Sequence, residues 1–187
     1  MKHSSQFKIS KTIYCLPHVQ EKKHCDVFNA MIDLTVRLRI TWTSRHRPDE
    51  DKLCSLRGSD ETRCGTGFIR FVCSSVCDEL CPCVQCDGKI RNSFLKFTVQ
   101  TAQHVVYNTE EARAAMVDLF YDDDSCRWDG IMKTVIGLEV VKSKPDRDFS
   151  YMLCVTHDKA LSERIQSAWR CWWCQWFSFN TTYKFLF

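Results

Sequence analysis

The chain has 187 residues, of which 44% are hydrophobic and 26% are charged, as in a globular protein of one domain. Its formal net charge of +3 comes from scattered basic residues, which argues against a nucleic-acid partner. No apolar stretch has the length of a transmembrane helix or the form of a secretory signal, so the sequence predicts a cytoplasmic protein with no membrane partner.

The N-terminal half alternates between irregular segments and strands. Residues 1–25 are predicted to be irregular or disordered, and a short helix is expected within residues 26–33. In residues 34–42, LTVRLRITW, apolar and polar side chains alternate strictly, which predicts a strand with one buried face. After a polar loop, GTGFIRFV at residues 65–72 predicts a second strand, entered through two glycines.

The C-terminal half continues the strand pattern. Further strands are expected within residues 93–102, 114–123, 134–143 and 148–156. A helix is expected over residues 156–170, and residues 171–187 are predicted to form an irregular tail because their aromatic residues follow no period. Six short strands predict an all-β fold: a single six-stranded antiparallel barrel over residues 26–155, followed by a short C-terminal helix.

Three fragments of these strands contain side chains that suit catalysis. They are GTGFI at residues 65–69, TAQHVV at 101–106 with His104, and KPDRDFSYML at 144–153 with Asp148. In this order they resemble the N-terminal half of a trypsin-like (chymotrypsin-fold) serine protease, especially of the HtrA/Deg-like branch. The resemblance implies that His104 is the general base and that Asp148 orients it, at a site that needs no cofactor.

The nucleophile of that family is missing from the sequence. The family's serine lies in a Gly-x-Ser-Gly-Gly segment, whose glycines permit the turn and the oxyanion hole. The last glycine of this chain is Gly137, and too few residues follow Asp148 to build a second barrel. The sequence therefore predicts a truncated or inactive relative of a serine endopeptidase, with a peptide or protein as its substrate or partner.

Thirteen cysteines are many for a chain expected in the reducing cytosol, where clustered thiols bind metal more often than they form disulfides. Five of them lie in CSSVCDELCPCVQCDG, residues 73–88, expected as a hairpin between the second and third strands. A structural zinc held by Cys77, Cys81, Cys83 and Cys86 is one interpretation, because zinc prefers four thiolate or imidazole ligands in a tetrahedron. A loop of reduced thiols, or of disulfides in a secreted protein, is the other.

Two other functions are compatible with the sequence. A zinc-stabilised, non-enzymatic protein-interaction module would use the barrel only as a scaffold. A binding barrel unrelated to proteases would leave His104 and Asp148 far apart, since nothing would require them to meet. His157, which follows the last expected strand, is predicted to be an ordinary surface histidine, and the adjacent Asp158 is predicted to cap the helix.

Overall fold

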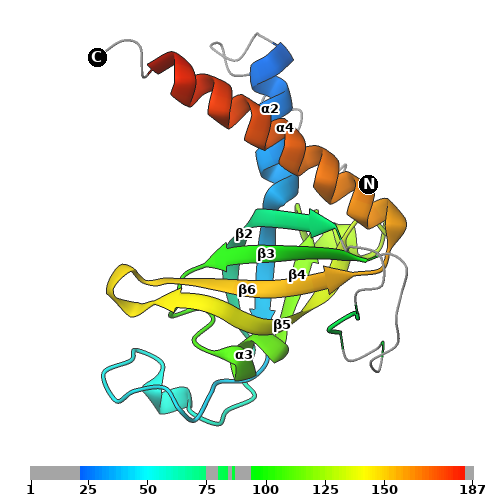
Figure 1. Cartoon of the computed structure of the whole chain (residues 1–187). Coiled ribbons are helices and arrows are strands. Elements are labelled where there is room, and N and C mark those ends of the chain that lie inside the picture. Colours follow the sequence, from blue (N-terminus) through cyan, green and yellow to red (C-terminus); the bar gives the residue numbers. More distant parts are fainter. Residues whose placement is uncertain (1–21, 75–79, 84–85, 87–93, 184–187) are drawn as a thin grey trace, which may run out of the picture.

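Six strands close into one antiparallel barrel, in the order β1-β2-β3-β6-β5-β4 (Figure 1). The structure is a computed structural model that describes residues 22–74, 80–83, 86 and 94–183. The strands are β1 Thr35–Ile40, β2 Arg63–Ser74, β3 Leu95–Thr101, β4 Ala115–Leu119, β5 Lys133–Lys144 and β6 Phe149–Thr156. The predicted all-β fold with a single six-stranded antiparallel barrel is confirmed.

The interior of the barrel is filled by alternate residues of its strands. In β1, Val36, Leu38 and Ile40 are buried, whereas Arg37 and Arg39 point outward between them. The same alternation of buried and partly exposed residues runs through β3. Because each fully buried aliphatic side chain contributes roughly 1.5–3 kcal/mol, these inward rows supply much of the stability of the barrel.

Two glycines of β2 let the barrel wall close tightly. A Cβ atom on Gly67 would lie 2.4 Å from Val99 Cγ1, and one on Gly65 would lie 2.4 Å from Val105 Cγ1. Both distances are well inside van der Waals contact, so any other residue would push β3, or the turn that follows it, outward. The Gly-Thr-Gly sequence thus brings β2 close to the turn that carries His104.

The helices lie at the two ends of the barrel. They are α2 Lys22–Leu34, α3 Thr109–Arg113 and α4 Lys159–Tyr183, with short 3-10 helices at Cys54–Leu56, Asp124–Arg127 and Pro145–Arg147. Helices α2 and α4 pack against each other at one end, while residues 41–62 and α3 lie at the opposite end (Figure 1). Among the described residues, no helix combines the length and the apolar character that crossing a membrane requires.

Both terminal predictions need correction. Helix α2 begins at Lys22, inside the segment predicted to be irregular through residue 25, and α4 continues past residue 170 to Tyr183. Trp172 of α4 is buried, and its ring meets that of Phe68 edge to face at 5.2 Å between centroids. Over residues 171–183 the predicted irregular tail was wrong because packing of an aromatic face against α2 and β2 stabilises a helix whose sequence has no clear period, and residues 184–187 lie outside the described residues.

Strands β3 and β6 pair over residues 95–101 and 150–156, and a cluster of titratable side chains lies at each end of the pair. Leu95 pairs with Thr156 at one end, and Thr101 pairs with Ser150 at the other. A strand rises about 3.4 Å per residue, so these ends are roughly 20 Å apart. The end of β3 and the start of β6 therefore share one neighbourhood, and the start of β3 and the end of β6 share another.

Candidate functional site

His104 and Asp148 meet where β3 ends and β6 begins. The imidazole Nδ1 of His104 lies 2.6 Å from Asp148 Oδ2, and the backbone N–H of His104 donates to Asp148 Oδ1 over 3.0 Å. One carboxylate therefore binds both the ring and the backbone of the same histidine. The structure brings together the two residues that the sequence paired, and it excludes the arrangement in which they lie far apart.

The local backbone places both residues. After β3 the chain turns, and the N–H groups of Val105 and Val106 donate to the carbonyl of Ala102 over 3.0 and 3.2 Å. Asp148 follows the 3-10 helix Pro145–Arg147 with a φ of 46°, in the left-handed region that aspartate enters more often than most residues. The residue that supplies the carboxylate thus has an uncommon backbone conformation, as residues at functional sites often do.

The pair is open to solvent, since the side chains of His104 and Asp148 are 57% and 53% exposed. Burial raises the pKa of Asp148, but hydrogen bonds from the backbone N–H and the imidazole of His104 outweigh it and hold that pKa below its ordinary value. Asp148 is therefore ionised at neutral pH and favours the tautomer of His104 with the proton on Nδ1. In that tautomer Nε2 has a lone pair that can accept a proton.

A nucleophile is missing from this arrangement. Within residues 22–74, 80–83, 86 and 94–183, no hydroxyl or thiol hydrogen-bonds to His104 Nε2. Ser150 follows Asp148 closely, but its Oγ is buried in the barrel without a hydrogen-bond partner. Among the described residues, His104 and Asp148 thus have the arrangement of the histidine and aspartate of a catalytic triad, and no nucleophile joins them.

Cys81, Cys83 and Cys86 gather around His157 at the other end of β3 and β6. The Nε2 atom of His157 lies 3.4, 3.2 and 3.1 Å from the three Sγ atoms, in that order. All four atoms lie within 4.8 Å of one another. In a tetrahedral zinc site with usual bond lengths, nitrogen and sulfur ligands are about 3.5 Å apart. The group therefore has the composition and the spacing of a Cys3His metal site.

This group changes the predicted set of metal ligands. Three of the four predicted cysteines belong to it, and Cys77 lies outside the described residues. The fourth member is His157, and its prediction as an ordinary surface histidine was wrong, because its ring is partly buried and contacts all three thiols. The pairing of β6 with β3 carries His157 to the cysteines. Its position directly after a strand was the only sequence signal, and that signal has no meaning until the strand order is known.

Apolar side chains cover part of the cluster, since Phe94 and Val155 pack with Cys81 and Cys86 in a small buried core. Burial raises the pKa of Cys81 to about 12. Burial also raises the pKa of Cys83, but hydrogen bonds with His157 and with the other two thiols outweigh it and lower that pKa to about 7. Because thiolates are the metal-binding form, a bound cation would ionise all three cysteines.

Packing sets the orientation of the His157 ring. The ring lies edge to face with that of Phe94, with 6.1 Å between centroids, and turns Nε2 toward the thiols. Its Nδ1 is buried and has no hydrogen-bond partner in the described part of the chain. Metal-bound histidines commonly donate a hydrogen bond through their second nitrogen, so this site would rely on packing for the same purpose.

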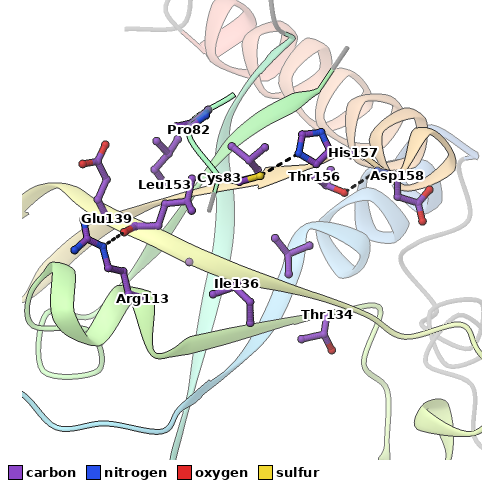
Figure 2. Close-up of a pocket in the computed structure, with 14 residues that line it drawn as sticks. Pro82, Cys83, Arg113, Thr134, Ile136, Glu139, Leu153, Thr156, His157 and Asp158 are labelled. Carbon is purple, nitrogen blue, oxygen red and sulfur yellow. Dashed lines mark hydrogen bonds between the residues drawn. The ribbon is translucent and has the colours of Figure 1, made fainter. Parts of the chain in front are cut away.

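A groove of about 740 Å³ runs along β5 and β6 beside the cluster (Figure 2). Cys83 and His157 point toward each other on one side of it, and Arg113 lies on the other, where its Nε donates to the carbonyl of Leu138 over 3.2 Å. Ile136 and other apolar residues of the two strands line the space between them. The candidate metal centre thus borders a depression in the surface, whose lining does not include the turn around His104.

Comparison of the chain with models of protein families, with curated proteins and with solved structures gives no match. The resemblance of GTGFI, TAQHVV and KPDRDFSYML to the protease family is thus neither supported nor contradicted by a relative. The chemistry and the geometry of the two clusters are the basis for assigning a function.

Proposed function

We propose that this chain is a relative of trypsin-like serine endopeptidases that retains the general base and the orienting carboxylate of the triad. The observation that carries the proposal is the 2.6 Å contact between His104 Nδ1 and Asp148 Oδ2, together with the backbone hydrogen bond to the same carboxylate. His104 would accept a proton from a serine hydroxyl at Nε2, and Asp148 would stabilise the resulting imidazolium. The substrate class is a peptide or protein.

The architecture supports the same proposal. The resemblance implied a closed six-stranded antiparallel barrel with the histidine after one strand and the aspartate before another, and His104 and Asp148 have these places next to β3 and β6. The described residues offer His104 no hydroxyl to deprotonate. We therefore expect the 187-residue chain by itself to bind peptides without hydrolysing them. Hydrolysis would need a serine supplied by another polypeptide segment.

Three measurements test this proposal. A fluorophosphonate probe, which reacts covalently with activated serines, should leave the purified chain unlabelled, and fluorescent casein should stay intact. Labelling or hydrolysis that His104→Ala abolishes would show that the chain is active alone and would contradict the proposed inactivity. Nitrogen-15 NMR tests the base: a neutral His104 ring protonated mainly on Nε2 could not accept a serine proton, and that result would remove the protease assignment.

A structural zinc ion on Cys81, Cys83, Cys86 and His157 is the second proposal. It is supported by three nitrogen–sulfur distances of 3.1–3.4 Å in a partly buried group of four suitable ligand atoms. Zinc held by four protein side chains stabilises a fold and leaves no open position for catalysis. The barrel would then be a zinc-stabilised interaction module, which is the candidate function if His104 proves inert.

Metal analysis of the purified protein tests the zinc proposal. We expect one zinc ion per chain by plasma mass spectrometry and a lower thermal midpoint after addition of a chelator. His157→Ala should reduce both the zinc content and the response to chelator. A preparation that takes up no zinc from zinc-containing buffer, and whose midpoint is insensitive to chelator, would remove this second function.

A further inference from the structure

Arg47 is the centre of a buried polar network beside the turn that carries His104. The residue is only 2% exposed, although its guanidinium is charged. Nε and Nη2 each donate to an oxygen of Glu111 over 2.6 Å, and Nη1 donates to both oxygens of Asp51 over 3.0 and 2.9 Å. Nη2 also donates to the backbone carbonyl of His104 over 3.0 Å. All five N–H groups of the guanidinium therefore have acceptors.

Glu111 of α3 is the fully buried partner of this arginine. In addition to the two bonds from Arg47, its carboxylate accepts hydrogen bonds from the N–H groups of Ser44 and Tyr107 over 2.9 and 3.0 Å. Burial raises the pKa of Glu111, but these donors outweigh it and keep that pKa below its ordinary value. Arg47 and Glu111 are thus both charged in the interior. All N–H groups of the guanidinium and both oxygens of the carboxylate are hydrogen-bonded.

The network holds the backbone of the turn that carries His104 from one side. Arg47 Nη2 binds the carbonyl of His104, and Arg63 Nη1 donates to the carbonyl of the next residue, Val105, over 3.3 Å. Asp148 binds the N–H and the imidazole of His104 from the other side. The peptide groups before and after the His104 Cα are therefore both held by charged side chains.

A buried ion pair is a costly way to stabilise a fold. Each charge loses hydration worth several kcal/mol, and an apolar pair of similar volume is often equally stable or more stable. The apolar pair cannot bind a backbone carbonyl, whereas a planar guanidinium can bind a carboxylate and a carbonyl together. We propose that Arg47 and Glu111 are positioning residues that set the orientation of His104 toward Asp148. This inference rests on the proposed function of His104 as a base.

The decisive variant replaces the ion pair by an apolar pair, Arg47→Met with Glu111→Leu, in the full 187-residue chain. We expect it to fold, with a urea midpoint close to that of the wild type. The neutral His104 ring, assigned by comparison with His104→Ala, should carry its proton mainly on Nδ1 in the wild type and mainly on Nε2 in the variant. The nitrogen-15 chemical shifts of the ring distinguish these tautomers, and a role of the pair in stability alone would leave them unchanged.

A matched control is available on the outer side of β1 and β4. Asp118 is also a fully buried carboxylate, and it accepts hydrogen bonds from Arg39 Nε and Nη2 over 2.7 and 2.8 Å. The variant Arg39→Met with Asp118→Leu removes a similar ion pair from a different part of the wall, where Asp118 also binds Arg37. We expect the tautomer ratio of His104 in this variant to equal that of the wild type.

If the apolar double variant does not fold, Arg47→Lys takes its place, because lysine keeps the charge but has three donors in place of the five planar ones that bind Glu111, Asp51 and the His104 carbonyl. A folded variant of either kind with the wild-type tautomer ratio overturns the inference, and so does an equal change in the Asp118 control. The readout needs no peptidase activity. An Nε2-protonated ring in the wild type would remove the proposed function and the inference together, whereas a wild-type Nδ1 majority that no variant changes would remove the inference alone.

Discussion

The two ends of the β3–β6 pair carry clusters of opposite character. At one end, His104 and Asp148 are more than half exposed and are held by hydrogen bonds. At the other end, Cys81 and Cys86 are buried among apolar side chains. The three thiols and His157 Nε2 offer four ligand atoms within 4.8 Å of one another, whereas the described residues place no hydroxyl on His104 Nε2. The cysteine–histidine cluster therefore offers four possible metal ligands, whereas the exposed pair has no nucleophile beside it among the described residues.

This difference matches what each chemistry requires. A structural metal ion is held best by four protein ligands out of reach of water. A general base must be reached by the group whose proton it takes, within hydrogen-bond distance of a bound substrate. Under the two proposals, the same pair of strands would support a site for stability at one end and a site for recognition at the other.

The largest expected effect comes from a substitution in the cysteine–histidine cluster, the candidate metal site. Cys86→Ser should lower the free energy of unfolding of the zinc-loaded protein by roughly 5 kcal/mol or more, because the free energy of zinc binding contributes directly to folding. Urea unfolding with and without chelator measures this. Cys64→Ser is the control, since Cys64 is exposed on β2, and its change should stay within about 0.5 kcal/mol. Equal sensitivity of the two variants to chelator would contradict the assignment.

The next largest effect concerns the buried ion pair of Arg47 and Glu111, which lies beside the turn that carries His104. Arg47→Ala should destabilise the protein by about 3–5 kcal/mol, because it leaves the carboxylate of Glu111 buried without its charged partner. Combining it with Glu111→Leu should restore most of that loss, as a double-mutant cycle in urea can measure. A loss below about 1 kcal/mol for the single variant would show that water reaches Glu111 and that the pair is not a buried unit.

The buried pair of Arg47 and Glu111 should also make the free energy of unfolding depend more steeply on pH in acid. The pKa of Glu111 is lowered from its ordinary value of 4.5, so its ionised form stabilises the fold above that pH, and this contribution is lost as the pH falls through the lower folded value. Wild-type stability should therefore fall more steeply below pH 4.5 than that of Arg47→Met with Glu111→Leu. The metal site is the same in both proteins, so its own response to acid cancels in the difference. Parallel pH profiles would count against the ionised pair.

The smallest expected change in stability comes from a substitution in the exposed pair of His104 and Asp148. Asp148→Asn should change the free energy of unfolding by less than about 1 kcal/mol, because the ion pair that it removes is more than half exposed. It should nevertheless move the proton of neutral His104 from Nδ1 to Nε2, as ring nitrogen-15 shifts can show. Asp146→Asn removes a nearby exposed carboxylate and should leave the tautomer unchanged. A ring that responds equally to both variants would be responding to charge alone.

Local patterns were sufficient for most of the barrel. The alternation in residues 34–42 predicted β1 and its buried face, because a one-residue slip would turn every apolar side chain toward water. The succession of GTGFI, TAQHVV and KPDRDF singled out His104 and Asp148, and it did so from short motifs around each residue. The clustering of Cys81, Cys83 and Cys86 along the chain likewise indicated a metal site.

The amino-acid sequence by itself therefore determined the strands, the candidate base with its carboxylate, and three of the four candidate metal ligands. The tertiary structure alone decided that His157 joins the cysteines, that Arg47 reaches Glu111 and the carbonyl of His104, and that α4 continues to Tyr183. The reason is physical: alternation, turns and close thiol pairs are local properties of a chain, whereas these contacts depend on which strands pair and which helix faces are covered. Strand order leaves no period in a single segment, and the aromatic-rich second half of α4 shows none for its buried face.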